Sequence, residues 1–364
     1  MIRRKDILDA LRQSLLCGEG EGILVSSEIN QRYVSGFAYT DGYILILPEK
    51  AYLLADFRYI EAAKNAVCSD DFEVIMPDGS MLSELTLLSG LEGVRRLYLE
   101  EASLSLGILE KLKKSLGGVE LVGGASEAML AKRAVKASWE LEKIAQAQAI
   151  TDKAFEHIIN FIRPDMTEIE IALELEFFMR RNGAEAVAFD TIAVSGSASS
   201  MPHGVPRNVP LERGFLTMDF GARVDGYCSD MTRTVVIGKA DAEMKRLYDT
   251  VLSAQKAALD IISEGIECRR ADAAARDIIN GAGYEGCFGH SLGHGVGMYI
   301  HESPRFSPAS SESELLCRGN VVTVEPGIYI EGKYGCRIED MIAVDHTGKV
   351  VNFTKSRKDM IEIL

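Results

Sequence analysis

Four acidic residues in the last 150 positions of the chain stand inside or beside apolar, strand-like runs. Asp219 and Asp230 lie in RGFLTMDFGARVDGYCSDMTRT, and Glu325 and Glu339 lie in NVVTVEPGIYIEGKYGCRIED. A carboxylate in an apolar strand costs free energy unless a cation or another partner neutralises it. The histidine-bearing segment GHGVGMYIHESP lies between the two pairs. The pattern therefore predicts a metal site.

The chemistry of such a site follows from its ligands. Four carboxylates and one imidazole suit two divalent cations that share bridging oxygens, and two ions about 3.5 to 4 Å apart can hold a hydroxide and polarise a substrate carbonyl. Oxygen-rich ligation with a single nitrogen favours Mn²⁺, with Co²⁺ and Zn²⁺ as alternatives. The motif HExxH is absent, which argues against a thermolysin-like site with one zinc ion. The acidic set thus predicts hydrolysis.

The spacing within each acidic pair predicts a β-hairpin. Asp219 and Asp230 are eleven positions apart, so a two-residue loop at Val224–Asp225 would oppose them on one face. The apolar residues of the first strand would cover its other face: Leu216, Met218 and Phe220. Glu325 and Glu339 are fourteen apart, which needs a loop of odd length or a bulge, and EGKYG can supply either.

The elements that carry these hairpins repeat along the chain. The first half has a helix over 138–163, a second helix opened by the capping box Thr167–Glu170 and closed at Asn182–Gly183, and then the aspartate hairpin. The second half has helices over about 241–265 and 270–283, followed by the glutamate hairpin. Two such halves are expected to pack about a pseudo-twofold axis that brings the hairpins face to face, unless the similarity is chance.

An α/β domain precedes this repeat. Six β-rich runs alternate with helical stretches between Gly22 and Gly124, which predicts an N-terminal domain over 1–124. The paired glycines of GGASEAMLAKRAVKAS suggest a linker over 125–132 and a second domain over 133–364. The long first helix of that domain is expected to be capped by Ser138.

Composition excludes several classes of partner. The chain has 364 residues, 47% hydrophobic content and a formal charge of −14, without a basic cluster, so nucleic acid is not expected as a partner. Charges at Lys5 and Asp9 argue against a signal peptide, and no run of 18 apolar residues predicts a membrane span. Seven cysteines without a CxxC pair indicate reduced thiols rather than zinc ligands. A cytoplasmic location is expected.

Four of the six histidines fall between Pro202 and Pro304: His203, His290, His294 and His301. The glycines on both sides of His294 let the backbone approach closely, so one imidazole can reach a metal. Alone, a glycine-flanked histidine is more often an ordinary loop residue. GHGVG also resembles a phosphate-loop fragment, but it lacks GK[ST] and GxGxxG, so nucleotide binding is the poorer interpretation.

Together these motifs resemble a known family. DFGARVDGYCSDMTRT, SLGHGVGMYIHESP, TVEPGIYI and CRIED are similar in order and spacing to the pita-bread metallopeptidases, in the branch of Xaa-Pro aminopeptidases, prolidases and non-metallic creatinases. YVSGF and LLADFRYIEAA resemble the creatinase-like N-terminal domain of that branch. The resemblance implies an α/β (α+β) fold in which a smaller creatinase-like domain precedes a pita-bread catalytic domain with pseudo-twofold halves.

The resemblance also implies a role for each site residue. The five residues matching the dinuclear ligands are Asp219, Asp230, His294, Glu325 and Glu339. In the family the first aspartate chelates one ion, the second aspartate and last glutamate bridge, and the histidine and first glutamate complete the other ion. Glu325 would also shuttle the proton to the leaving nitrogen. His203 and His301 match the histidines that bind substrate and stabilise the oxyanion. Arg337 would orient Glu339, and Arg305 is compatible with binding a substrate carboxylate.

The expected function is that of a dinuclear metallo-exopeptidase, a homodimer, that cleaves small peptides between an N-terminal residue and proline. Substrate length, which separates a prolidase from an aminopeptidase, stays open. Two alternatives are a metal-free creatinase-type hydrolase, which would lack the full ligand set, and a pita-bread binding protein without catalysis. Methionine aminopeptidases share the ligands but usually lack the N-terminal domain.

Overall fold

The computed structural model describes residues 4–67 and 69–364, and the chain divides into two compact units, Met1–Arg133 and Ala134–Leu364. Cys68 lies outside the described residues, and the other six cysteines are thiols that form no disulfide bond with one another. Within the described ranges, none of the helices combines the length and apolar composition that a membrane span requires.

The first unit is a six-stranded mixed sheet with helices around it, in the order β4-β3-β2-β1-β5-β6. Each of the six β-rich runs of the sequence forms one strand, which confirms that prediction: β1 (Glu21–Val25), β2 (Tyr43–Ile46), β3 (Ala51–Leu54), β4 (Glu73–Ile75), β5 (Arg96–Leu99) and β6 (Glu120–Val122). The helices are α1 (Lys5–Leu15), α2 (Glu28–Ser35), α3 (Ile60–Ala66), α4 (Met81–Leu91), α5 (Leu106–Ser115) and α6 (Ala125–Ala134). Leucines of the sheet and of α4 and α5 fill the core.

The residues expected as a linker, 125–132, lie in helix α6. The paired glycines mark the start of this helix, because Gly124 has a positive φ and its carbonyl accepts the Ala128 N–H. Met129 and Arg133 are buried, and Arg133 donates to Asn30 at 2.8 Å. The segment is thus ordered by packing within the first unit.

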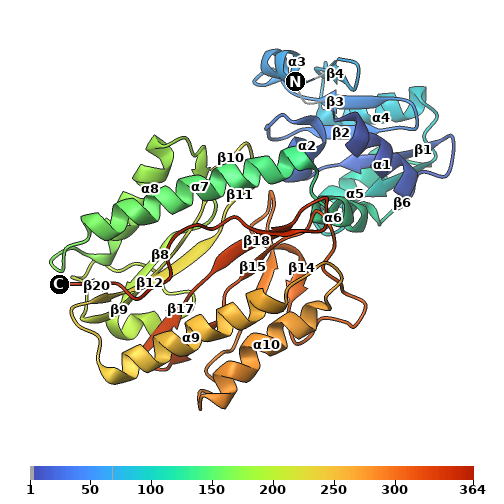
Figure 1. The fold of residues 1–364 in the computed structure, drawn as a ribbon. Helices are drawn as coiled ribbons and strands as arrows, with labels where there is room; N and C mark the ends of the chain where they lie inside the picture. The colour runs from blue at the N-terminus through green and yellow to red at the C-terminus, as the bar shows by residue number, and fades with distance from the viewer. Residues whose placement is uncertain (1–3, 68) are drawn as a thin grey trace. The chain divides into compact units, whose positions relative to one another are not determined.

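The second unit has two halves, each with two helices packed on strands (Figure 1). The first half contains α7 (Ser138–Phe161), α8 (Glu168–Arg181), β7 (Ala186–Val187), β8 (Ile192–Ser195), the 3₁₀ helix η1 (Gly196–Ser200), β9 (Gly214–Phe220), β10 (Ala222–Val224), β11 (Tyr227–Cys228) and β12 (Met231–Ile237). The second half contains α9 (Ala242–Ile261), α10 (Cys268–Gly281), β13 (Gly293–Gly295), β14 (Glu302–Phe306), β15 (Val321–Val324), β16 (Gly327–Ile330), β17 (Tyr334–Arg337), β18 (Asp340–Val344) and β19 (Val350–Asn352).

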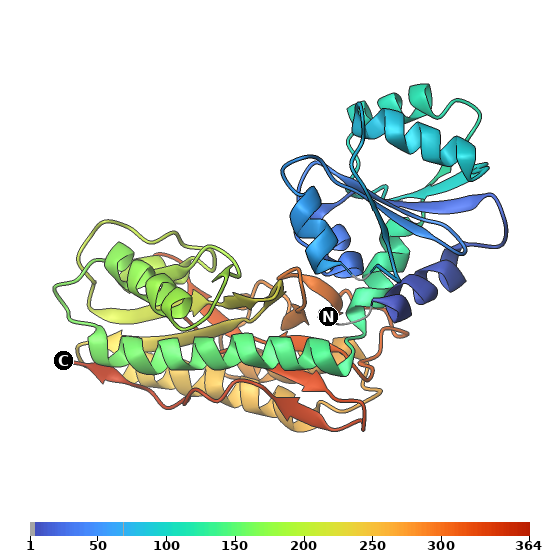
Figure 2. The same ribbon diagram turned by 90° about the horizontal axis from the view of Figure 1, so that it is seen from above.

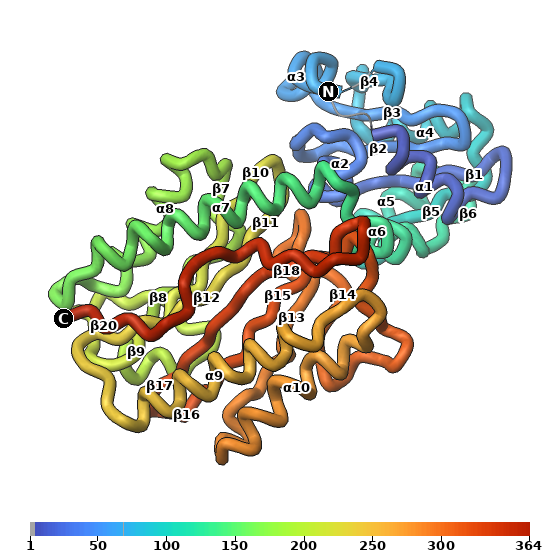
Figure 3. Tube along the Cα trace, viewed as in Figure 1, coloured from blue at the N-terminus to red at the C-terminus, as the bar shows by residue number. Residues whose placement is uncertain are grey.

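The main sheets of the two halves have the orders β20-β12-β9-β8 and β14-β13-β15-β18-β19. The closing strand β20 (Glu362–Ile363) belongs to the first of them and pairs with β12, so the end of the chain returns to the first half (Figure 3). Smaller sheets, β11-β10-β7 and β16-β17, extend the two hairpins.

The internal repeat of the second unit is visible in its element boundaries. Helix α7 ends at Phe161 and α9 at Ile261, while α8 begins at Glu168 and α10 at Cys268, an offset of 100 residues at both places. Each junction makes a matching isolated bridge to the other side of its half, Thr167 with Pro210 and Glu267 with Leu315. The halves therefore share one plan, as the sequence predicted.

Helix caps decide where these helices begin. Thr167 and Glu170 form the predicted capping box: Glu170 N–H donates to Thr167 Oγ1 at 3.2 Å, and Thr167 N–H donates to the Glu170 carboxylate at 2.7 Å. The prediction that Ser138 caps α7 is wrong, because Ser138 is already helical and Ala137 precedes the first turn. The Glu140 carboxylate accepts the Ala137 N–H at 2.8 Å and so caps the helix instead. Helix α7 then runs unbroken beside the strands (Figure 2).

The aspartate hairpin differs from its predicted register. Thr232, not Asp230, pairs with Asp219, and the two-residue loop is Asp225–Gly226 rather than Val224–Asp225. Both loop residues have positive φ, 49° and 89°, which is the type I′ geometry that a tight hairpin prefers. Asp230 lies two positions from Thr232, so the strand alternation still directs it to the face of Asp219.

The glutamate hairpin has the odd loop that the sequence required. β16 and β17 are joined by three residues, 331–333, with Gly332 at a φ of 68°. β15 pairs with β18 in the same register as β16 with β17, so the two sections form one long hairpin. Glu325 and Glu339 occupy opposing positions at the break between the sections.

Candidate metal centre

The nine residues singled out in the sequence line one cavity of about 410 Å³ in the second unit: His203, Asp219, Asp230, His294, His301, Arg305, Glu325, Arg337 and Glu339. Eight of them lie in a strand or directly next to one, in both halves of the repeat, and His203 lies in the loop between η1 and β9. Strand ends suit this task because the neighbouring strands fix the backbone while the side chains point into open space.

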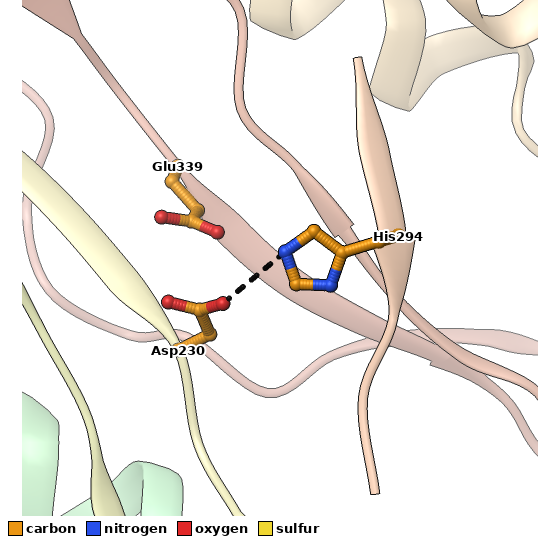
Figure 4. Close-up of side chains that lie close together, drawn as sticks. All are labelled: Asp230, His294 and Glu339. Carbon is orange, nitrogen blue, oxygen red and sulfur yellow. Dashed lines mark ion pairs between the residues drawn. The ribbon is translucent and has the colours of Figure 1, made fainter. Parts of the chain in front are cut away.

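Asp230, His294 and Glu339 form a compact cluster of three ligand residues. One ligand atom of each lies within 4.8 Å of the others, and all three residues are buried. Figure 4 shows the two carboxylates and the imidazole directed toward a common point from different strands. His294 Nε2 lies 3.5 Å from Asp230 Oδ2 and 3.4 Å from Glu325 Oε1. These distances leave room for a cation among the four side chains.

The protonation state of His294 fits a metal ligand. Its Nδ1 lies 3.0 Å from the Gly295 carbonyl oxygen, and a proton on Nδ1 leaves Nε2 free to face the carboxylates. Burial and the neighbouring His301 lower the pKa of His294 to about 3. The imidazole is therefore neutral at physiological pH, as ligation requires.

The glycines beside His294 are required by close packing. A side-chain carbon on Gly293 would collide with the Thr323 carbonyl, whereas one on Gly289 would meet only open space. We therefore expect Gly293→Ala to displace β13, to lower metal affinity by at least about tenfold, as loss of a ligand's support does, and to lower the thermal midpoint. Gly289→Ala is the matched control, measured by calorimetric metal titration and thermal unfolding. Equal metal affinity in both variants would show that β13 does not set the position of His294.

Arg337 and Thr232 connect the two hairpins. Arg337 Nη2 donates to Asp219 Oδ2 at 2.6 Å and Nε donates to Thr232 Oγ1 at 2.9 Å, while Thr232 Oγ1 donates to Glu339 Oε2 at 2.7 Å. The sequence predicted that Arg337 orients Glu339. The structure instead places its guanidinium on Asp219, and among the hydrogen bonds of the described residues it reaches Glu339 through Thr232.

The carboxylates carry more negative charge than the described residues neutralise. Asp219 Oδ1 and Glu339 Oε1 are buried and have no hydrogen-bond partner within the described part of the chain. Burial and then Glu339 raise the pKa of Asp230 well above its usual range, and burial and then Glu325 do the same for Glu339. Burial raises the pKa of Glu325 to about 8. A bound cation would pair with the unpartnered oxygens and reduce the repulsion between the carboxylates. This ligand set therefore fits divalent metal ions.

Two residues without a predicted role belong to the same site. His290 lines the cavity, and its Nε2 lies 3.0 Å from the hydroxyl of Tyr329. That hydroxyl accepts from Arg337 Nη1 at 2.6 Å. Burial and then Arg337 lower the pKa of His290 to about 4, so it is neutral. The signal for His290 was its place four residues before His294, but nothing in the sequence singled out Tyr329.

The remaining wall of the cavity is mixed in character. His203 and His301 lie on the lining with Arg305, and the His301 and His294 rings are 4.4 Å apart in an edge-to-face arrangement. Burial and then Arg305 lower the pKa of His301. Three large apolar side chains also line the cavity: Phe189, Ile192 and Ile300. A polar centre with an apolar wall can hold a small peptide and exclude part of its water.

Comparison with known proteins agrees with this geometry. Residues 142–346 match the model of Metallopeptidase family M24, and residues 8–135 match that of the Creatinase/Prolidase N-terminal domain. The Xaa-Pro dipeptidase of Pyrococcus horikoshii is 36% identical over 94% of both chains. A solved Xaa-Pro dipeptidase from Bacillus anthracis is 38% identical, with a TM-score of 0.93 over 99% of this chain and 100% of that one.

A second solved structure is similar over nearly the same extent. The X-Pro aminopeptidase from Thermotoga maritima is 37% identical, with a TM-score of 0.88 over 94% of this chain and 97% of the other. The similarity thus spans both units, each with its own family model. The chain belongs to Metallopeptidase family M24, with a Creatinase/Prolidase N-terminal domain before the pita-bread domain that carries the site.

Proposed function

We propose that this protein is a metal-dependent exopeptidase that hydrolyses the bond between an N-terminal residue and proline. The observation that carries the proposal is the single cavity in which four carboxylates and one neutral imidazole converge beside His203 and His301. The names of its relatives, Xaa-Pro dipeptidase and X-Pro aminopeptidase, support the same substrate class.

Two divalent ions, held by Asp219, Asp230, His294, Glu325 and Glu339, would supply the activated water and polarise the scissile carbonyl. We propose Mn²⁺, because four of the five ligand residues offer oxygen. Glu325 is proposed to take the proton of the attacking water and to give it to the leaving nitrogen. His203 and His301 are proposed to hold the substrate and to donate to the oxyanion.

Hydrolysis of an Xaa-Pro bond requires a binding site of its own. Its amide is tertiary, carries no N–H and has a restricted shape, so a site that recognises an ordinary peptide N–H handles it poorly. Phe189, Ile192 and Ile300 give the cavity an apolar wall that suits a pyrrolidine ring or the side chain before it. Hydrogen-bond donors for the substrate then come from side chains around the carboxylate cluster.

We further propose that dipeptides are preferred over longer peptides. Arg305 lines the cavity, and its guanidinium can pair with the C-terminal carboxylate that the proline of a dipeptide carries. A charge-assisted hydrogen bond contributes about 1.5 to 3 kcal/mol, which is about 10- to 100-fold in kcat/KM. Arg305→Met should lower kcat/KM for Xaa-Pro by this factor, mainly through KM.

A peptide panel tests this preference. Release of proline from Xaa-Pro and of Pro-Yaa from Xaa-Pro-Yaa is measured under Mn²⁺, Co²⁺ and Zn²⁺ for the wild type and Arg305→Met. Arg318→Met, at an exposed arginine paired with Glu264, is the control. Equal cleavage of both series, with the same small loss in both arginine variants, would instead identify an aminopeptidase.

The assembly and location of the enzyme are also proposals. We propose a homodimer, following the resemblance, and light scattering of the purified protein checks it. The six free cysteines that the structure describes suit a reducing compartment and support a cytoplasmic location.

A further inference from the structure

A buried ion pair lies beside the catalytic cavity and is not part of its lining. Lys136 Nζ is 3.0 Å from Glu302 Oε2, and the two side chains are 1% and 2% exposed. Lys136 stands just before α7, and Glu302 is the first residue of β14. Charged side chains are seldom buried this completely without a geometric role, since an apolar pair would fill the space at lower cost.

The loop between His294 and Glu302 folds around the glutamate carboxylate. Tyr299 N–H donates to Glu302 Oε1 at 3.0 Å, and Gly297 has no room for a side chain because the carboxylate lies against its backbone. The Gly297 carbonyl in turn accepts the Cys228 N–H at 2.8 Å, from the aspartate hairpin. The Glu302 carboxylate therefore holds the backbone of this loop in place through these contacts.

The backbone around Lys136 is also fixed by hydrogen bonds. Its N–H donates to the Gly319 carbonyl at 2.8 Å, and Gly319 N–H donates to the Val344 carbonyl at 2.7 Å. Asn320 Nδ2 donates to the Ala134 carbonyl at 2.9 Å. The lysine therefore presents its ammonium from backbone fixed to the long glutamate hairpin.

His301 directly precedes Glu302, so the position of the carboxylate limits where the imidazole can lie. Glu302 also pairs with Gly295, the neighbour of His294, at a register shift in the β13–β14 ladder. The shift and the 4.4 Å separation of the two rings place His301 next to the metal-ligand candidate. One ion pair thereby fixes both ends of the loop.

We propose that Lys136 and Glu302 are positioning residues that hold His301 in the orientation required to donate to the oxyanion. The inference rests on the proposed function for the role of His301, but the geometry that it describes does not. When Lys136 is neutralised, the buried carboxylate loses the ammonium 3.0 Å away and is expected to shift toward its other polar neighbours. This shift would move the loop that folds around the carboxylate and turn His301 away.

The test is a double-mutant cycle on the metal-loaded enzyme. Lys136→Met is expected to lower kcat for an Xaa-Pro dipeptide by about 10²-fold, the cost of a displacement of about 1 Å in a catalytic group. The loss should fall mainly on kcat, because the oxyanion forms only in the transition state, and metal content should stay within about twofold. Lys333→Met makes the same change at an exposed pair with Glu243 and should keep wild-type kcat.

The double variant Lys136→Met/Glu302→Gln separates positioning from loss of stability. A neutral amide oxygen still accepts the Tyr299 N–H and does not depend on the Lys136 ammonium, so kcat should recover at least about tenfold over Lys136→Met. If Lys136→Met does not fold, Glu302→Gln compared with the double variant makes the same comparison. Additive losses in kcat, or a folded Lys136→Met enzyme with wild-type kcat, would overturn the proposal.

A spectroscopic readout does not depend on activity. The ring carbon–proton signals of His301, assigned by His301→Gln in histidine-labelled protein, should move in Lys136→Met and return in the double variant. His157, on α7 and paired with Glu174, provides the reference signal. An unmoved His301 signal in Lys136→Met contradicts the positioning role, whereas absence of Xaa-Pro cleavage by the wild type, with the His301 shift present, would contradict only the proposed function.

Discussion

Asp230→Asn and His294→Ala are expected to lower the bound metal below two ions per chain and to reduce kcat for an Xaa-Pro substrate by at least about 10³-fold. The factor corresponds to the several kcal/mol of transition-state stabilisation that metal ions supply. Both residues are buried, and their ligand atoms lie 3.5 Å apart. Asparagine keeps only a neutral amide oxygen in place of the carboxylate, and alanine offers no ligand atom.

Asp230→Asn should affect the thermal stability of the metal-free protein and the stability gained on metal binding in opposite directions. Without metal, the variant removes one of several buried carboxylates that raise one another's pKa, so its thermal midpoint should equal or exceed that of the wild type. With metal, the wild type should gain stability as the ion concentration rises above the dissociation constant, while the variant gains less. Elemental analysis and thermal unfolding with and without Mn²⁺ measure both effects.

Asp225→Asn is the matched control for this pair of variants. Asp225 lies in the loop of the same hairpin, at a φ of 49° that asparagine tolerates, and its side chain is exposed. It should keep two ions and wild-type kcat. Wild-type turnover by Asp230→Asn or His294→Ala would remove these residues from the mechanism.

Arg233→Met is expected to lower the free energy of unfolding by about 3 to 5 kcal/mol, the usual cost of breaking a buried ion pair. For a unit of this size, the loss should lower the thermal midpoint by about 10 °C. The Arg233 side chain is 1% exposed, pairs with Asp340 at 2.9 Å, and donates to the carbonyls of Thr232, Glu339, Ser356 and Arg357. The variant would leave Asp340 with Lys358 as its remaining ion-pair partner among the described residues.

The same variant should also weaken the metal site, because Arg233 joins the backbones of Thr232 and Glu339 behind the carboxylates. We expect metal affinity to fall by about tenfold or more, as when a ligand loses its supporting hydrogen bonds. Calorimetric unfolding measures the loss of stability, and calorimetric titration measures the loss of metal affinity. Arg318→Met, at an exposed arginine, is the control. A midpoint within 2 °C of the wild type would show that the buried pair stabilises little, since about 1 kcal/mol already shifts a unit of this size by that amount.

The sequence predicted the fold best where local chemistry decides the geometry. The capping box at Thr167 and the three-residue loop at 331–333 depend on residues within a few positions of one another. The aspartate hairpin shows the same principle through an error. The dipeptide Asp225–Gly226 is typical of a type I′ turn. The symmetric spacing of Asp219 and Asp230 instead predicts a loop one residue earlier, and the local turn signal is the one that the structure follows.

The sequence predicted those residues of the site that lie within recognisable motifs. The candidate ligands were recognisable because each stands in a characteristic sequence, and all of them line the cavity. The contacts of Arg337 with Asp219 and of Lys136 with Glu302 join residues 118 and 166 positions apart. Such pairs depend on how the two half-domains close, which local spacing does not determine.

Metal dependence is the central claim, and proline release by metal-free enzyme tests it most directly. Protein stripped with a chelator is titrated with Mn²⁺ while proline release from an Xaa-Pro dipeptide is followed. We expect no turnover at the start, a rise with added metal, and saturation at two ions per chain. Full hydrolysis by the metal-free enzyme, unaffected by chelator, would contradict the account and indicate a metal-free hydrolase of the creatinase type.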